Sequence, residues 1–253
     1  MSLSAFLPDA INHWFALFII LVSFGTSVIS ASLGLGGGIV LIAIMGLGIP
    51  LAALVPVHGV VQLGSNAGRS FVQRKHITKW VLLWFGAGSV VGAIVAGRLT
   101  LEMPENLWKF GLGTFIILIT WMPKPKFGKT AKPVVFLGGA FGAVLTMFFG
   151  ATGPFAMAVN APHSHTKHGV VATHAAAMTL QHLLKVLVFG FLGFAFMKWL
   201  PLMLAMVVSG YLGTIVGSKL LDKLPEAFFR KALKITVTVL AIALIGQALF
   251  AWI

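Results

Sequence analysis

Five polar residues in one apolar stretch, residues 51–73, have the spacing of a single helix face. They fall at positions i, i+4, i+7, i+8 and i+11, and they are His58, Gln62, Ser65, Asn66 and Arg69. This spacing places all five on one side of an α-helix. Histidine titrates near neutral pH, arginine is always charged, and amides and hydroxyls donate hydrogen bonds. Together these groups favour the binding of an anion.

A second stripe lies in the apolar stretch 169–194. Its members are His174, Gln181, His182 and Lys185, and 116 positions separate His58 from His174 and Arg69 from Lys185. Ionisable residues at membrane depth are costly and usually face a cavity or a partner. Two alternatives stay open at this point. The two basic side chains could snorkel to the membrane interfaces, and the histidines could be neutral groups bonded across helices.

A glycine-rich break precedes each stripe, at 34–38 (Gly-Leu-Gly-Gly-Gly) and at 150–154 (Gly-Ala-Thr-Gly-Pro). The apolar stretches that follow, 37–47 and 153–160, are too short to cross a bilayer as regular helices. A helix that starts at such a break presents free N–H groups and a positive dipole end, and glycine lets a ligand approach the backbone. We therefore expect an anion site at Gly36, Gly37, Gly38 and Gly153, with close helix packing as the alternative role of these glycines.

Neutral donors extend this predicted site. Thr152, Asn160, Gln181 and Ser65 could donate hydrogen bonds to an oxyanion. All five acidic residues lie near the ends of apolar stretches or in joints, at Asp9, Glu102, Glu105, Asp222 and Glu226. This argues against a carboxylate-based sodium or proton site. The histidines in 163–168 are interpreted as part of a solvated loop, so we expect neither a metal nor a cofactor.

The elements that must position these residues are membrane helices. Hydrophobic residues make up 58% of the 253 positions and charged residues 9%, whereas soluble domains carry about a quarter charged residues. Lipid offers the backbone no water, so helices are the default, and we expect an all-α polytopic bundle. Ten apolar stretches follow one another at 12–33, 37–47, 51–73, 78–99, 106–122, 132–150, 153–160, 169–194, 198–221 and 226–253.

The net charge of +13 does not indicate nucleic-acid binding, because most Lys and Arg residues lie in joints between the apolar stretches. Membrane topology requires such a distribution. The chain contains no cysteine, which excludes disulfides, thiolate metal sites and cysteine nucleophiles. The first apolar stretch lacks a preceding basic region and is interpreted as a retained helix.

An internal repeat divides the chain. Besides the two stripes, Gly34 matches Gly150, and at an offset of 121 the sequence 92–99 matches 213–220 and Pro104-Glu105 matches Pro225-Glu226. We therefore predict a first transmembrane repeat over 1–123, a basic cytoplasmic linker over 124–132 and a second transmembrane repeat over 133–253. Each repeat holds five of the apolar stretches.

The basic joints give an orientation. The joints 74–79, 124–132 and 219–234 are rich in Lys and Arg and should face the cytoplasm. The joint 48–56 is uncharged and should face outward. Five segments per repeat then turn the second repeat upside down relative to the first, as in many secondary transporters. Both termini are predicted outside, in a multi-pass protein of the cytoplasmic (inner) membrane.

These features resemble the TauE/SafE permeases, a family of sulfite and organosulfonate exporters and related anion transporters. The resemblance rests on the glycines at 34–38, their second copy at 150–154, and a repeat that spans nearly the whole chain. It implies transport of sulfite, an organosulfonate or a similar oxyanion. The family pattern has a proline a few residues after the glycine run, where this chain has Ala43.

The leading interpretation is a secondary transporter that moves a small anion by alternating access. Its partners would be the anionic substrate and the lipid bilayer, with a proton as a candidate coupling ion. No Gly-Lys-Ser/Thr follows a glycine run, so no ATP site is indicated. The alternatives are an anion channel on the same scaffold and an intramembrane enzyme that uses the histidines. The sequence does not predict the oligomeric state.

Overall fold

The computed structural model describes residues 11–97, 104–123, 131–220 and 226–251. Within these ranges the chain forms ten α-helices, no strand, and short 3-10 turns at Arg74–His76 and Ala161–His163. The prediction of an all-α fold is therefore confirmed for the described part of the chain. The helices are α1 (His13–Leu33), α2 (Gly37–Met45), α3 (Leu51–Val72), α4 (Lys79–Gly97), α5 (Glu105–Trp121), α6 (Lys132–Phe149), α7 (Gly153–Asn160), α8 (Lys167–Phe191), α9 (Phe196–Leu220) and α10 (Glu226–Phe250).

Glycine in a left-handed conformation ends both helices that precede the breaks. Gly34 closes α1 with φ 81° and Gly150 closes α6 with φ 74°. This conformation costs a residue with a Cβ roughly 1–2 kcal/mol, so the helices stop where the sequence predicts. The next helices, α2 and α7, have nine and eight residues, which confirms that both are too short to span a bilayer.

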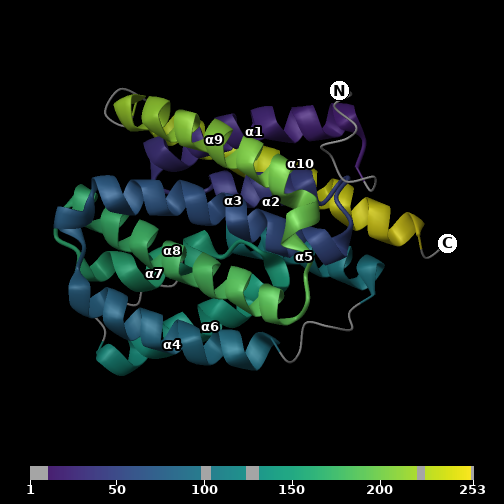
Figure 1. Ribbon diagram of the computed structural model, residues 1–253. Coiled ribbons are helices and arrows are strands. Elements are labelled where there is room, and N and C mark those ends of the chain that lie inside the picture. The colour runs from purple at the N-terminus through teal and green to yellow at the C-terminus, as the bar shows by residue number, and fades with distance from the viewer. Residues whose placement is uncertain (1–10, 98–103, 124–130, 221–225, 252–253) are drawn as a thin grey trace.

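Six of the long helices form three layers, each of two helices, and the middle layer is a central pair (Figure 1). α3 packs against α8 in the middle, α1 packs against α9 on one side, and α4 packs against α6 on the other. α3 also contacts α9, and α8 also contacts α4, so the central pair joins the two outer layers. α5 and α10 pack together, and α10 contacts the short helix α2. The predicted polar stripes, on α3 and α8, therefore lie in the interior.

Backbone-to-backbone contact at glycine holds both outer layers together. A Cβ at Gly92 of α4 would collide with the carbonyl oxygen of Ala140 on α6. A Cβ at Gly213 of α9 would likewise collide with the carbonyl oxygen of Phe24 on α1. Gly92 and Gly213 are 121 positions apart, and Phe24 and Ala140 are 116 apart, so the two contacts join residues that match in the internal repeat. Such small residues are how membrane helices approach closely.

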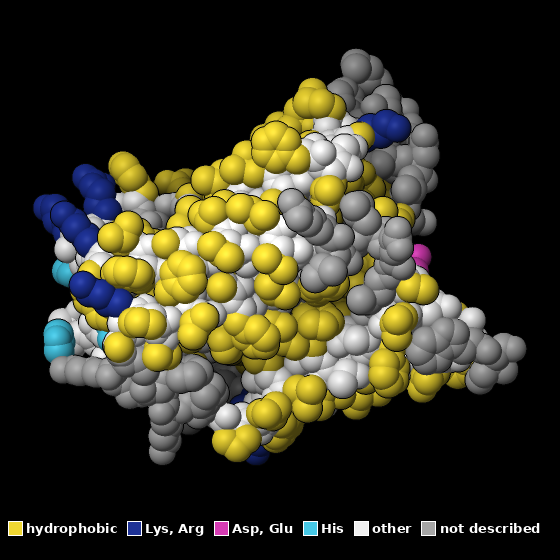
Figure 2. Space-filling view, turned by 90° about the horizontal axis from the view of Figure 1, so that it is seen from below, with side chains coloured by type: hydrophobic (Ala, Val, Ile, Leu, Met, Phe, Trp, Pro, Cys, Tyr) yellow, Lys and Arg dark blue, Asp and Glu magenta, His cyan; other side chains and the backbone are white. Residues whose placement is uncertain are grey.

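Six of the described helices are long and apolar enough to cross a membrane, namely α1, α4, α6, α8, α9 and α10. α3 is 22 residues long, but its polar stripe lowers its hydropathy, and α5 has 17 residues. On the face shown in Figure 2, hydrophobic side chains form a broad band and a group of Lys, Arg and His side chains lies at one end. The chain is thus a multi-pass membrane protein.

The joint 74–79, which was predicted to face the cytoplasm, lies beside the joint 163–168 and the start of α8. The Thr78 N–H donates to Thr173 Oγ1 at 2.9 Å, and the hydroxyls of Thr78 and Ser164 are 3.0 Å apart. The expectation of a solvated loop at 163–168 is wrong for His163, which is buried with its ring centroid 4.8 Å from that of Trp80. His165 and His168 are exposed.

Figure 1 also places the first turn of α1 and the last turn of α10 at the same end of the molecule. Other elements of the predicted topology lie outside the described residues. They are most of the linker 124–132, including Lys124, Lys126 and Lys129, and the charged residues Asp9, Arg98, Glu102, Asp222 and Lys223.

Candidate anion-binding site

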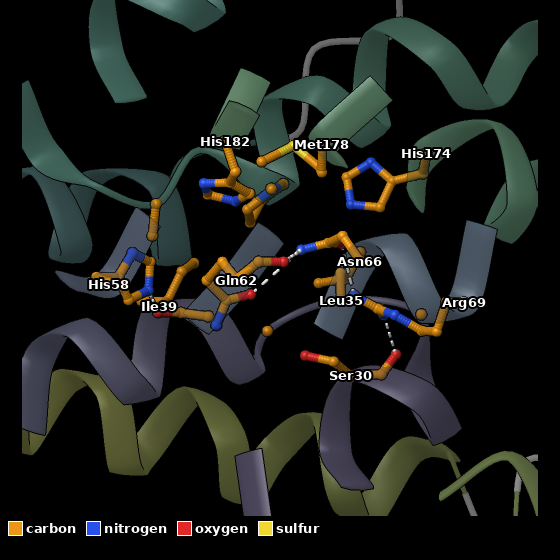
Figure 3. A pocket seen from close by; sticks show the side chains of 16 residues that line it. Ser30, Leu35, Ile39, His58, Gln62, Asn66, Arg69, His174, Met178 and His182 are labelled. Atoms are coloured by element: carbon orange, nitrogen blue, oxygen red, sulfur yellow. Dashed lines mark hydrogen bonds between the residues drawn. The ribbon is translucent and has the colours of Figure 1, made fainter. Parts of the chain in front are cut away.

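A small polar cavity lies where the two glycine breaks meet the central helices (Figure 3). Its volume is about 30 Å³, which is room for about two water molecules. α1, the first break, α2, α3, the second break, α7 and α8 all contribute to its wall. The lining residues are Ser30, Gly34, Leu35, Gly36, Gly38, Ile39, His58, Gln62, Asn66, Arg69, Ala151, Gly153, Pro154, His174, Met178 and His182.

Arg69 of α3 supplies a fixed positive charge to the cavity. One guanidinium nitrogen, Nη1, donates to the Ser30 carbonyl at 2.8 Å, and Nη2 donates to Asn66 Oδ1 at 2.6 Å. Asn66 is itself held by Gln62, whose carbonyl oxygen accepts from Asn66 Nδ2 at 2.8 Å. Arg69 is 5% exposed, so it does not snorkel to an interface. Its Nε has no hydrogen-bond partner among the described residues.

Lys185 of α8 lies behind the cavity wall. It is fully buried, at 0% exposure, so the snorkelling alternative does not describe this residue either. Its Nζ donates to the Gly150 carbonyl at 2.8 Å and lies 3.4 Å from His182 Nδ1. The Lys185 side chain passes Gly59 of α3 so closely that a Cβ at Gly59 would lie 2.9 Å from it. Lys185 therefore braces the second break and reaches the cavity through His182.

Three histidines line the cavity from opposite sides. His58 comes from α3, whereas His174 and His182 come from α8, and their side chains face one another across it (Figure 3). His58 Nε2 lies 3.0 Å from the Gly38 carbonyl, and the rings of His58 and His182 meet edge to face at 6.0 Å. The Nδ1 atoms of His58 and His174 are buried without a partner among the described residues. Buried polar atoms are normally paired. His58 Nδ1 lies near Gly150, where an added Cβ would be 3.6 Å from it, so His174 Nδ1 and Arg69 Nε are the atoms left for a ligand.

The two short helices begin at the cavity. The first N–H groups of any helix have no intrahelical partner and carry a partial positive charge. No side chain caps α2 at Gly36 or α7 at Thr152. At Gly36 the backbone has φ 106°, a conformation that essentially only glycine adopts. Gly36, Gly38 and Gly153 lie in the cavity wall, as expected for backbone that a ligand can approach.

Several residues expected at the site do not line this cavity. Gly37 serves close packing, because a Cβ there would collide with the Thr26 carbonyl of α1. Ser65 Oγ pairs with Ser27 Oγ at 3.4 Å. Gln181 turns towards the α4–α6 layer, where its Nε2 donates to Ser89 Oγ and to the Gly139 carbonyl.

Thr152 and Asn160 are buried, with polar side-chain atoms that have no partner among the described residues, but neither lines the cavity. Sequence reasoning did not place seven of the lining residues at the site, namely Ser30, Gly34, Leu35, Ile39, Ala151, Pro154 and Met178. Both breaks contribute to this wall, the first through positions 34, 35, 36 and 38 and the second through positions 151, 153 and 154. The glycine motifs themselves were the signal that could have included Leu35, Ala151 and Pro154.

The electrostatics of the cavity favour negative charge. None of the helices and breaks that line it contains an Asp or Glu residue. The described ion pair between Lys109 and Glu105, at 2.9 Å, belongs to α5. Within the described residues no group of three His, Cys, Asp or Glu could hold a metal ion. A buried guanidinium without a carboxylate partner is costly, and a bound anion would remove that cost.

Fold and cavity define a polytopic α-helical membrane protein with a buried, positively charged pocket between two broken helices. The profile of the family described as "Sulfite exporter TauE/SafE" matches residues 19–244. The match covers most of the chain, which therefore belongs to this family, as the glycine motifs indicated. Its members are membrane transporters rather than enzymes, and the family implies transport of sulfur-containing anions. No curated protein and no solved structure matches the chain significantly.

Proposed function

We propose that the chain is a secondary transporter that moves a small sulfur oxyanion, such as sulfite or an organosulfonate, across the cytoplasmic membrane. The observation that carries this proposal is Arg69, a buried cation that faces a cavity with no carboxylate in its wall. Arg69 Nε and His174 Nδ1 have no partner among the described residues, and both side chains line that cavity. Two of its sides are helix starts, which stabilise anions.

Alternating access would come from two repeats that run through the membrane in opposite directions. The paired packing of the outer layers supports this part of the proposal. If each helix of the first repeat corresponds to the helix five places later, the α1–α9 contact and the α6–α4 contact are equivalent. The same relation exchanges α3–α9 with α8–α4. A site at the interface of such repeats can be exposed to either side when one repeat rocks against the other.

A proton is the candidate coupling ion. The edge-to-face contact of His58 with His182, and the 3.4 Å separation of His182 Nδ1 from Lys185 Nζ, form a continuous set of groups that can hold a proton. A protonated histidine beside the cavity would add to its positive charge and so would favour the loaded state. Both termini and the uncharged joint 48–56 would lie outside, with the basic joints in the cytoplasm.

Sulfite uptake into proteoliposomes tests the proposal. The double variant Arg69→Ala with Lys185→Ala should lose at least 90% of the initial rate, since removal of buried charge that meets a ligand costs about 2–5 kcal/mol. The matched control is Arg74→Ala with Lys198→Ala, which removes one Arg and one Lys that are both exposed. Unchanged uptake in the first double variant would overturn the proposed site. Absence of counterflow with preloaded sulfite would identify a channel instead.

A further inference from the structure

A second and much larger hollow adjoins the anion cavity. Its volume is about 740 Å³, within the roughly 300–1,000 Å³ of small-molecule pockets. α5 and α10 form one side of it, and the starts of α2 and α7 form the other. Its lining residues are Leu35, Gly36, Ile39, Ile119, Thr120, Trp121, Pro154, Lys231, Leu233, Lys234, Ile235 and Val237.

The two hollows have one wall in common. Leu35, Gly36, Ile39 and Pro154 line both of them. Leu233 of α10 lies directly on Gly36, where an added Cβ would collide with the leucine side chain. The separation is therefore one residue thick, and part of it consists of the apolar side chains of Leu35, Ile39 and Leu233.

The two hollows differ in chemistry as much as in size. The inner cavity is polar and has room for about two water molecules, so it can hold an oxyanion group but not a carbon skeleton. The outer hollow is walled mainly by Ile, Leu, Val and Trp side chains, with Lys231 and Lys234 as its charged members. Lys234 Nζ lies 5.0 Å from the centre of the Trp121 ring. An apolar wall with nearby cations fits the hydrocarbon part of an organic anion.

We propose that the outer hollow is the subsite for an apolar substituent of the substrate. The substrate class is then an organic sulfur oxyanion with a hydrocarbon tail, in preference to sulfite itself. Its oxyanion group occupies the cavity beside Arg69, and its tail passes Leu233 into the hollow. Lys231 and Lys234 raise the local concentration of anions near this entry. This inference rests on the proposed function, because it takes the inner cavity as the site of the oxyanion.

A homologous series of n-alkanesulfonates tests the inference on the wild-type protein. Methane-, butane- and octanesulfonate compete with sulfite for uptake into proteoliposomes, and the inhibition constant of each is measured. Burial of one methylene group contributes roughly 0.8 kcal/mol, which is about fourfold in affinity. The inhibition constant should therefore fall steeply with tail length, by tenfold or more from methane- to butanesulfonate. Equal inhibition across the series, with sulfite uptake intact, would overturn the subsite and leave the proposed function standing.

Two variants of α10 locate the tail. Leu233→Gln places an amide in the hollow and should weaken octanesulfonate at least tenfold while methanesulfonate stays within about twofold. Leu249→Gln is the matched control, because Leu249 lies on the same helix with its side chain exposed, and it should change neither constant. Equal losses for both sulfonates in Leu233→Gln would contradict the inference.

A substrate subsite and an adventitious site for an amphiphile or a lipid differ in where the head group of the bound molecule lies, and variants of the basic residues distinguish the two. Arg69→Ala should weaken all members of the series by the same factor, because it removes a contact of the head group. Lys231→Gln with Lys234→Gln should change the constants less than Arg69→Ala does. If instead the lysine pair abolishes binding of octanesulfonate and Arg69→Ala does not affect it, the amphiphile binds head-outward as a lipid would, and the inference fails.

Discussion

The basic residue of the first repeat and that of the second occupy matching positions but have different surroundings. Arg69 lines the cavity, and its guanidinium joins α3 to the Ser30 carbonyl of α1. Lys185 lies outside the cavity wall and holds the Gly150 carbonyl at the end of α6. The two repeats therefore share the position of a positive charge, but the residues that this charge contacts differ. In the proposed site, Arg69 would touch the substrate, whereas Lys185 supports the second break through the Gly150 carbonyl.

The glycine breaks differ in the same way. In the first, Gly36 is the cap of α2, and Gly38 offers its carbonyl to His58. In the second, Thr152 stands at the position of Gly36 and Pro154 at that of Gly38. Proline has no N–H, so α7 offers the cavity one donor fewer than α2 does. The first repeat thus supplies more of the polar groups that line the cavity, and the second supplies two of the three histidines.

Single substitutions of the two cations give the largest expected effect and test this contrast. Arg69→Met should raise the KM for sulfite about 30-fold or more, because a direct charged contact is worth about 2 kcal/mol or more. Lys185→Met should raise it about tenfold, since its effect reaches the anion through His182 and the field alone. Initial rates in proteoliposomes measure both. Equal effects would mean that Lys185 also touches the substrate.

Substitutions of the packing glycines should have the next largest effect. Gly92→Ala and Gly213→Ala both force a Cβ onto a backbone carbonyl of the neighbouring helix, and overpacking of this kind costs roughly 1–3 kcal/mol. Both should lower the thermal unfolding midpoint in detergent by several degrees, to a similar extent. Gly25→Ala is the control, because a Cβ there meets nothing within 4 Å. Unequal losses would show that the two outer layers are not equivalent.

The glycines that end α1 and α6 should respond unequally. Gly34→Ala and Gly150→Ala each place a Cβ in the left-handed region at a cost of roughly 1–2 kcal/mol. At Gly150 the new Cβ would also collide with Ile42, whereas at Gly34 it would be in ordinary contact with Val171. The unfolding midpoint should therefore fall further for Gly150→Ala, and Ile42→Val should recover part of the loss. An equal fall of the two unfolding midpoints would show that the collision with Ile42 does not add to the cost.

The smallest expected effect concerns a hydrogen bond between layers. Ser209 Oγ of α9 donates to the Ile20 carbonyl of α1 at 2.6 Å. The matching position on α4 is Gly88, which instead lies against the Phe136 carbonyl of α6 without a side chain. Ser209→Ala should lower stability by about 0.6 kcal/mol, the average for hydrogen bonds between membrane helices. Calorimetry in detergent would detect it, and a loss above about 2 kcal/mol would indicate a role beyond this bond.

Much of the helix layout follows from the sequence. Apolar runs and glycine breaks predict the helix bounds to within a few residues because lipid imposes length and glycine permits the left-handed end. The α3 stripe was also predictable, but a stripe does not say which neighbour faces each of its residues. Gln181 turns to α4 and α6, and Ser65 turns to α1. Ser30 and Ile39 escaped prediction because they reach the cavity only through tertiary structure, in which α2 packs against α1 and α3 and Arg69 bonds the Ser30 carbonyl.

The uncompensated guanidinium of Arg69 has an electrical consequence for the transport cycle. Arginine does not lose its proton in proteins, so in the proposed cycle the empty site would be exposed to each side in turn with a positive charge, whereas a bound monovalent anion would cancel the charge of Arg69. A full unit charge that crosses the membrane potential changes the free energy by about 2.3 kcal/mol per 100 mV. In the proposed cycle, the voltage should therefore act more strongly on the return of the empty carrier than on the loaded step. Steady uptake would then depend on voltage more strongly than exchange of anion for anion.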